Sequence, residues 1–501
     1  MLRTQRLQRR EITYASAKEE EVNVLHQMGY YDQQTKFFAH LNNHRDQIKD
    51  IVARHLGLSS PAVCHVAEEN DWLHGSLNAC IPVTIVGPFG IRVMIRFPLP
   101  YRIGEDFGPG NADEKIRCEA GTYASLQENC LDIPIPRLYG FALSDGETLE
   151  NLPPLIQWIQ RFKRRFISWL GHPIPSKNIR SQRRSDNIIG TGYLLMEYIE
   201  PSRGTMLSNT WMDSQHDMQL STNLFRDPSR IFLSLIRVPR PRIGSFIIDD
   251  HKGFLVLAYR PLSVEIQLLE NGRMLTDIHR DYTYSTVDSY LTDILTFHVH
   301  RFRYQPNALS FLTGMRAVFK ILFQANLRRG PFILTFTDMH QSNIFVDKDS
   351  NITCLVDLER ACSRPIEMSN PPHWLTHKGV DELVLSDYDA VQTEFMGIMT
   401  AKEKRQHPTA VERDNSKELR QILPAVMNNS WATGTFWYTL ALSSPSGLFG
   451  TFKEHIRPLF CRDYIEEFNL VMLFLWKGMW NTSQAANSRI KNSTTKNSDA
   501  D

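Results

Sequence analysis

The chain has 501 residues, of which 42% are hydrophobic and 22% are charged, and its formal net charge is +1. These values are ordinary for a globular protein that is long enough for two or more lobes, and the bulk charge gives no case for a nucleic-acid partner. The strongest apolar run, 470–476, ends at Lys477 and is far too short to span a membrane.

Cysteine usage and the N-terminal composition bear on the compartment. The 7 cysteines are scattered and show no Cys-x-x-Cys spacing, which argues for reduced thiols in an intracellular protein and against a disulfide framework or a zinc site. The opening MLRTQRLQRR is rich in arginine, as mitochondrial presequences are. The acidic run Glu19-Glu20-Glu21 favours an ordinary exposed helix instead. We therefore expect a cytoplasmic protein, with a mitochondrial one as the alternative.

Apolar spacing predicts a helical N-terminal extension over 1–61, which packs on the part that follows. The first lobe, 62–200, is expected to be an antiparallel sheet with one helix, because β-branched residues cluster in short segments. Strands are expected at 63–66, 81–86, 92–97 and 138–141, the helix at 114–129 after a cap at Asn111-Ala112-Asp113, and a strand and hinge at 193–201. Between them, 145–187 reads as a loop-rich basic insert, either a solvated loop or a patch for phosphate-bearing partners.

The second lobe, 202–480, is expected to be mainly helical. Helices are predicted near 211–236, 290–301 and 309–327, with a hairpin formed by 243–249 and 254–257. The tail 481–501 is rich in Ser, Thr, Asn and Lys, a composition typical of disorder.

The segment 335–359, TFTDMHQSNIFVDKDSNITCLVDLE, carries the most specific pattern. Asp338 and Asn343 stand in the spacing Asp-x-x-x-x-Asn, and Asp357 ends an apolar strand. In phosphoryl transfer one carboxylate orients the attacking hydroxyl, while an amide and a second carboxylate hold Mg²⁺ against ATP phosphates. A hairpin of 344–347 and 352–356 would bring Asp357 beside Asn343. Mg²⁺ suits such oxygen ligands. A surface hairpin of the same composition is the alternative.

On these residues the chain resembles the aminoglycoside phosphotransferase and choline kinase group of small-molecule kinases, and most closely its large fungal branch. The resemblance covers roughly residues 62–400. It implies an α+β, two-lobed, protein-kinase-like fold with an ATP site between the lobes. It also implies transfer of the γ-phosphoryl group to the hydroxyl of a small molecule, with Asp338 as catalytic residue and Asn343 and Asp357 as Mg²⁺ ligands. The acceptor and the oligomeric state are not specified.

The resemblance also implies where the nucleotide binds. The turn at Gly75, Ser76 and Asn78 would lie above the ATP phosphates, although hairpins use glycine for backbone reasons alone. The hinge would bind the adenine edge through Glu197, Tyr198 and Ile199.

Arg96 occupies the place of the kinase strand lysine, where its permanent charge would bind the α- and β-phosphates. Glu119 of the helix would be its partner. The alternative is an exposed pair of Lys115 and Glu119, four residues apart on a helix.

The chain departs from the group at two places: Phe336 stands where most members have histidine, and Arg360 where related sequences often have an aromatic residue. Together with Arg96 these changes support a rival reading, a nucleotide-binding or silent pseudokinase that acts by interaction. A protein kinase is disfavoured because Asp357-Leu358-Glu359 replaces Asp-Phe-Gly. In antibiotic-modifying relatives, acidic residues after the metal-binding aspartate bind cationic substrates. The acidic residues here either do the same or form a solvated helix face: Asp381, Glu382, Asp387, Asp389 and Glu394.

Overall fold

The computed structural model describes the chain between residues 4 and 475 with gaps. The segments outside the described part are 1–3, 8–9, 20–23, 88–89, 152–177, 181–188, 215–217, 250–252, 275, 302–305, 377, 406–413, 445–446, 463–465, 469, 473 and 476–501. The tail predicted at 481–501 and most basic residues of the insert therefore lie outside it. Within the described residues, no helix combines the length and the apolar character that crossing a membrane requires.

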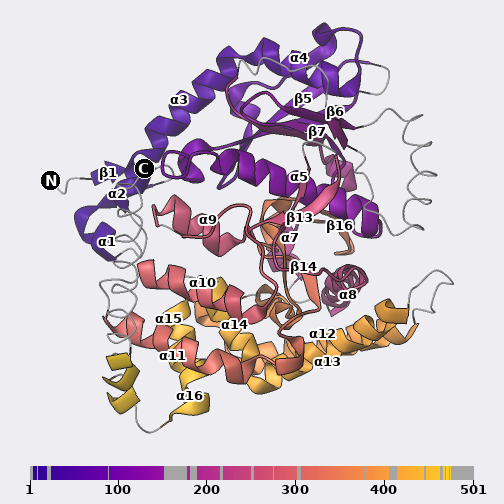
Figure 1. The fold of residues 1–501 in the computed structure, drawn as a ribbon. Helices are drawn as coiled ribbons and strands as arrows, with labels where there is room; N and C mark the ends of the chain where they lie inside the picture. The colour runs from indigo at the N-terminus through magenta and orange to yellow at the C-terminus, as the bar shows by residue number, and fades with distance from the viewer. Residues whose placement is uncertain are drawn as a thin grey trace, which may run out of the picture.

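The first lobe is an antiparallel sheet with strand order β3-β5-β6-β10-β7-β8-β9, and β4 also pairs with β5 (Figure 1). Its strands are β3 (Cys64–Val66), β4 (Leu73–His74), β5 (Asn78–Ile85), β6 (Arg92–Pro98), β7 (Leu138–Ala142), β8 (Thr148–Asn151), β9 (Asn178–Arg180) and β10 (Tyr193–Glu197). The strands β8 and β9 come from the segment expected to be a loop-rich insert. There the expectation was incomplete, because the ends of the insert extend the sheet.

Helices cover both faces of this sheet. On β10, Leu195 packs with α3 (Tyr30–Asn43) and α4 (Arg45–Leu56), whereas Leu194 and Met196 pack in the core that includes α5 (Asn111–Asn129). This division follows from the strand period of two, which sends successive side chains to opposite faces. The N-terminal helices thus supply half of the core of the first lobe. The chain before them forms β1 (Thr4–Arg6), β2 (Glu11–Thr13), α1 (Tyr14–Glu19) and α2 (Val24–Met28).

Helix α5 begins three residues before the predicted start, at the segment read as its cap. The cap comes from Glu105 instead, whose carboxylate accepts hydrogen bonds from the backbone N–H of Gly110 (2.6 Å) and of Ala112 (2.7 Å). A carboxylate at this end is favourable because the first N–H groups of a helix have no partner within it.

The second lobe is mainly helical, as predicted. Its helices are α7 (Leu207–Ser214), α8 (Met218–Leu235), α9 (Val264–Asn271), α10 (Val287–Arg301), α11 (Pro306–Leu322), α12 (Leu385–Arg405), α13 (Asp414–Thr433), α14 (Thr435–Ser443), α15 (Leu448–Thr451) and α16 (Arg457–Phe460). The hairpin predicted from 243–257 is confirmed as β12 (Ser245–Ile248) and β13 (Leu255–Tyr259).

The lobes meet where α5 packs against β12. Gly121 of α5 lies so close that a Cβ there would be 2.2 Å from the carbonyl oxygen of Phe246. Only a residue without a side chain permits this approach, because a backbone atom of a paired strand cannot move aside. The lobe junction therefore depends on a glycine in the middle of a helix, where glycine is otherwise unfavourable.

We predict that Gly121→Ala lowers the free energy of unfolding by about 1–3 kcal/mol, the usual cost of overpacking. The matched control is Gly397→Ala in α12, where a Cβ would meet nothing within 4 Å. That change should raise stability by about 0.5–1 kcal/mol, because alanine is the better helix former. Denaturant unfolding measures both. Equal stability of the two variants would contradict the close packing of α5 on β12.

Candidate active site

Two antiparallel strand pairs of the second lobe are nested in the sequence, because both strands of one pair lie between the strands of the other. The outer pair is β14 (Phe332–Phe336) with β17 (Ala361–Pro365), and the inner pair is β15 (Ile344–Val346) with β16 (Ile352–Leu355). The inner hairpin is the one predicted from the sequence, whereas the outer pairing was not. Together they bring the end of β14 and the start of β17 to the same point as the loop before β15.

This nesting brings the three candidate residues of the catalytic segment together. The N–H of Val356 donates to the carbonyl of Asn343 (3.0 Å), so that Asp357 follows directly beside it. The side-chain nitrogen of Asn343 donates to the backbone oxygen of Asp338 (2.9 Å). Asp338, Asn343 and Asp357 all line one cavity of about 20 Å³. That volume holds about one water molecule, so a nucleotide cannot enter without movement.

Asp357 has a left-handed backbone, with φ of 60°. Such a conformation is uncommon for a residue with a side chain, although aspartate tolerates it better than most. It turns the chain sharply after β16, and the carboxylate meets Arg96 of the first lobe at 2.7 Å.

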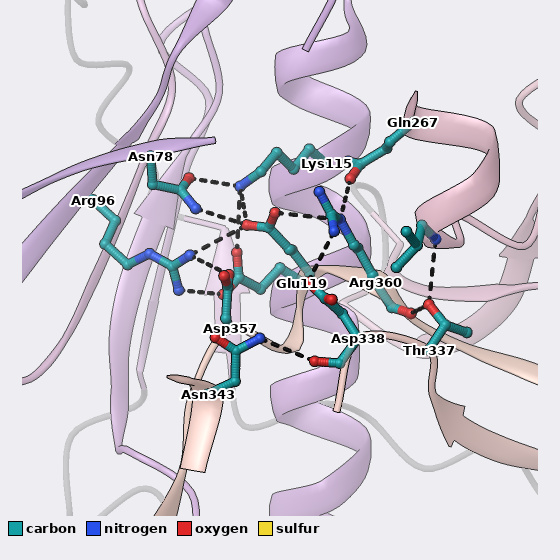
Figure 2. A network of polar contacts seen from close by, with 12 residues as sticks. Asn78, Arg96, Lys115, Glu119, Gln267, Thr337, Asp338, Asn343, Asp357 and Arg360 are labelled. Atoms are coloured by element: carbon teal, nitrogen blue, oxygen red, sulfur yellow. Dashed lines mark hydrogen bonds and ion pairs between the residues drawn. The ribbon is translucent and has the colours of Figure 1, made fainter. Parts of the chain in front are cut away.

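Arg96 is the centre of a buried network between the lobes (Figure 2). Its guanidinium contacts the carboxylates of Glu119 at 2.8 Å, Asp357 at 2.7 Å and Glu359 at 3.2 Å. The ion pair that the resemblance implies between Arg96 and Glu119 is therefore present. It joins β6 to α5. This is the pair of strand cation and helix carboxylate that the resemblance implies.

Sequence reasoning missed two members of this network, Lys115 and Glu359. The amine of Lys115 contacts Glu359 at 2.6 Å and the side-chain oxygen of Asn78 at 2.7 Å. Asn78 in turn donates to Glu359 at 2.8 Å. Lys115 is fully buried, 3.7 Å from Glu119, so the alternative of an exposed pair of these residues is wrong. The available signal for Glu359 was its position two residues after Asp357.

The network contains more negative than positive charge. Arg96 and Lys115 face the three carboxylates of Glu119, Asp357 and Glu359. Burial, only partly offset by the cations, raises the pKa of Glu119 to about 7 and that of Asp357 to about 6. Burial opposes ionisation of Glu359 as well, but Lys115, Arg96 and Arg360 hold the pKa of its carboxyl well below the ordinary value. Glu119 and Asp357 are thus the carboxyls of the network that hold a proton most readily.

Asp338 forms an ion pair with Arg360, at 2.8 Å, which the sequence did not predict. The Nε of Arg360 also donates to Gln267 (2.8 Å), and its backbone oxygen accepts from the hydroxyl of Thr337 (2.6 Å). Burial raises the pKa of Asp338, while Arg360 opposes that rise. Phe336, in place of histidine, pairs with Ala361 in the outer strands and packs against the core of the second lobe. Packing and an ion pair therefore hold the loop of Asp338.

The residues that the resemblance assigns to nucleotide binding do not all lie at one place in the structure. Gly75 and Ser76 form an exposed turn between β4 and β5, and a Cβ on Gly75 would meet nothing within 4 Å. No part of the described chain packs closely on this glycine, so the turn is open to solvent. Asn78 instead belongs to the buried network. In the hinge, Glu197 pairs with Arg203 at 2.9 Å.

Beyond Glu197, the ring of Tyr198 lies under the guanidinium of Arg92, 4.2 Å away, and Arg92 also pairs with Glu200. Ile199 follows Tyr198 and is partly buried. These contacts hold the hinge at the end of β10 against β6.

The donor set is compatible with a magnesium ion that takes some ligands from phosphate and water. The described residues contain no group of three or more His, Cys, Asp and Glu side chains that could hold a metal ion alone. Asp357 offers a carboxylate with excess negative charge nearby. Asn343 uses its amide nitrogen in a hydrogen bond, so its amide oxygen is the atom that it can offer. Mg²⁺ characteristically takes one or two protein oxygens and completes its shell with water and phosphate.

No protein-family model matches the sequence, and no curated protein matches it either. Solved structures do. The macrolide 2'-phosphotransferase MphH from Brachybacterium faecium is 12% identical over 84% of this chain and 99% of its own, with a TM-score of 0.33. APH(2")-IIia, solved with GDP and kanamycin, is 10% identical over 86% of this chain and 98% of its own, with a TM-score of 0.36.

An ethanolamine kinase from Plasmodium vivax is 10% identical over 83% of each chain, with a TM-score of 0.33. Similarity at this level supports no conclusion about function. The two-lobed fold rests on the sheet, the helices and the nested strand pairs described above.

Titration of Glu119 should make stability depend on pH. Its pKa rises from 4.5 in the unfolded chain to about 7, so the native state keeps this proton to higher pH. The stabilisation is complete below about pH 4.5 and is lost as the pH rises to about 7. We predict that Glu119→Gln, which has no proton to lose, flattens this decline by up to about 1.4 kcal/mol per pH unit.

Denaturant unfolding between about pH 4.5 and 7.5 measures this slope. The control is Glu68→Gln, since Glu68 is 78% exposed in its pair with Arg45. That variant should keep the native slope. Identical slopes for the native chain and Glu119→Gln would show that Glu119 does not titrate in this range.

Proposed function

We propose that this protein is an ATP- and Mg²⁺-dependent phosphotransferase that moves the γ-phosphoryl group to the hydroxyl of a small molecule. One observation carries the proposal: Asp338, Asn343 and Asp357 line a single cavity, and the Arg96–Glu119 pair reaches Asp357 from the other lobe. An isolated surface hairpin has no reason to place three polar residues against a buried ion-pair network between two lobes.

Each residue has a distinct task in this reaction. Asp338 orients the acceptor hydroxyl and takes its proton as the new bond forms between the acceptor oxygen and the γ-phosphorus. The bond from the γ-phosphorus to the bridging oxygen breaks at the same time, and ADP leaves with that oxygen. A carboxylate whose pKa is raised by burial is a better proton acceptor than an ordinary one. Magnesium, held by Asn343 and Asp357, would neutralise charge on the phosphates.

Binding of the nucleotide requires Arg96 to change partners. In the structure one guanidinium nitrogen binds Glu119 and the other binds Asp357 and Glu359. Arginine can keep the first contact while the second nitrogen turns to a phosphate oxygen, because its planar head offers separate donors. Asp357 is then released for the metal ion. The same movement opens the cavity, which is too small in this state.

A silent pseudokinase is the second candidate, and a specific observation favours it. Arginines hold both carboxylates required for transfer: Arg360 holds Asp338 and Arg96 holds Asp357. If neither arginine yields to Mg-ATP, the same residues form a stable junction between the lobes and perform no chemistry.

Binding of Mg-ATP can be measured first. At a nucleotide concentration about a hundred times the dissociation constant, the native chain should gain roughly 2.7 kcal/mol of stability. We predict that this gain requires magnesium and is lost in Asp357→Asn. Thermal unfolding with ATP, with and without EDTA, measures it. If Mg-ATP gives the native chain no gain in stability, a pseudokinase that does not bind nucleotide is favoured.

Transfer itself is tested by Asp338→Ala. Because proton transfer by a positioned side chain contributes roughly 10²–10⁴-fold, turnover with any accepted alcohol should fall by that factor, while the stabilisation by Mg-ATP remains. The control is Asp349→Ala, an exposed aspartate in the turn of the inner hairpin, which should keep full turnover. Full turnover in Asp338→Ala would exclude Asp338 as the catalytic residue.

A further inference from the structure

A second cavity, of about 190 Å³, lies on the other side of the catalytic loop. Phe336, Thr337 and Met339 line both this cavity and the small one that contains Asp338. The residues immediately before and after Asp338 are therefore a wall common to both. Trp374 fixes this wall, since its indole N–H donates to the backbone oxygen of Met339 (2.6 Å).

The wall of the second cavity mixes apolar side chains with serine, threonine and asparagine. The apolar side chains include Phe232, Met368, Trp374, Phe436 and Leu440, from four different parts of the second lobe. A cavity of about 150 Å³ is enough for one benzene ring, and pockets for drug-sized molecules begin at about 300 Å³. The occupant therefore has an apolar part the size of about one ring.

The charges around the cavity disfavour a cation. Among the described residues that line it, none is an aspartate or glutamate, and the one with a permanent charge is Arg364. That charge has a buried counter-charge in Glu265, 3.7 Å away. An ammonium group would lose its water here and find no carboxylate at the wall in exchange. An uncharged molecule loses nothing comparable.

The acidic residues after Asp357 that the sequence offered as a binding site for cationic substrates do not line this cavity. Asp387 pairs with Lys378, and Asp389 accepts a hydrogen bond from the indole of Trp431. Glu382 and Glu394 are exposed. Of these side chains, the ones that the structure describes form a solvated face of the second lobe.

We propose that this cavity binds the phosphoryl acceptor, and that the acceptor is an uncharged alcohol with an apolar body of about one ring. This proposal rests on the proposed function, because it supplies the hydroxyl that Asp338 orients. The apolar body occupies the larger cavity, and the hydroxyl passes the wall at Thr337 and Met339 to reach Asp338. The transferred group comes from the nucleoside triphosphate, and the hydroxyl proton goes to Asp338.

Matched alcohols that differ in charge test the proposal on the full-length chain. The first pair is 3,3-dimethylbutan-1-ol and choline, which have the same shape, and the second is 2-phenylethanol and its 4-aminomethyl derivative. Ligand-detected NMR without nucleotide measures binding. We expect the neutral member of each pair to bind at least about tenfold more tightly. Equal binding, preference for the cation, or no binding of any of the four would overturn the proposal.

Two variants locate the binding. Ser443→Phe places a ring into the cavity from the end of α14 and should abolish binding of the neutral alcohols, with the Mg-ATP stabilisation unchanged. Ala432→Phe adds the same ring at an exposed position of α13 and should change neither. Unchanged binding in Ser443→Phe would place the alcohol elsewhere.

Failure of the two proposals can be told apart. Neutral alcohols that bind in the cavity without phosphoryl transfer from Mg-ATP would support the cavity's specificity and refute the phosphotransferase. Transfer to choline in preference to its neutral isostere would support the phosphotransferase and refute the specificity.

Discussion

The buried guanidinium of Arg96 is the interaction on which the rest of the structure depends. It leaves β6 of the first lobe and meets Glu119 of α5 together with Asp357 and Glu359 of the second lobe. A buried arginine charge is tolerable only with such partners, and removing one partner typically costs about 3–5 kcal/mol. The close approach of α5 to β12 and the left-handed turn at Asp357 both serve to bring these oxygens within reach.

Local signals in the sequence predicted much of this arrangement. The hairpin of β15 and β16 is short, so alternation and a turn between its strands were enough to place Asp357 beside Asn343. A cap signal likewise predicted α5, and clusters of β-branched residues predicted strands that flank it. The partnership of Arg96 and Glu119 came from the resemblance to kinases and not from spacing, because nothing local connects β6 to a helix that starts thirteen residues after it ends.

What the sequence could not predict depends on distant contacts and on burial. The pairing of β14 with β17 joins strands separated by a whole hairpin, and neither strand carries a mark of its partner. Lys115 and Glu119 have the spacing of an exposed pair, and only the packing of α5 between the lobes shows that both are buried. Arg360 counted against activity as a departure from the family, yet it is the partner of Asp338.

The charge balance connects the resting structure with the proposed reaction and with its rival. Three cations (Arg96, Lys115 and Arg360) face four carboxylates (Glu119, Asp338, Asp357 and Glu359), so a further positive charge at Asp357 would offset a surplus of negative charge. The metal ion would offset this surplus at Asp357, and the phosphates would give Arg96 a new anion. A ligand shifts such an equilibrium only by its difference in affinity for the two states. The phosphotransferase and a pseudokinase that binds no nucleotide therefore differ in the sign of one free-energy difference. In the phosphotransferase, Mg-ATP binds the opened network more tightly than Arg96 binds Asp357.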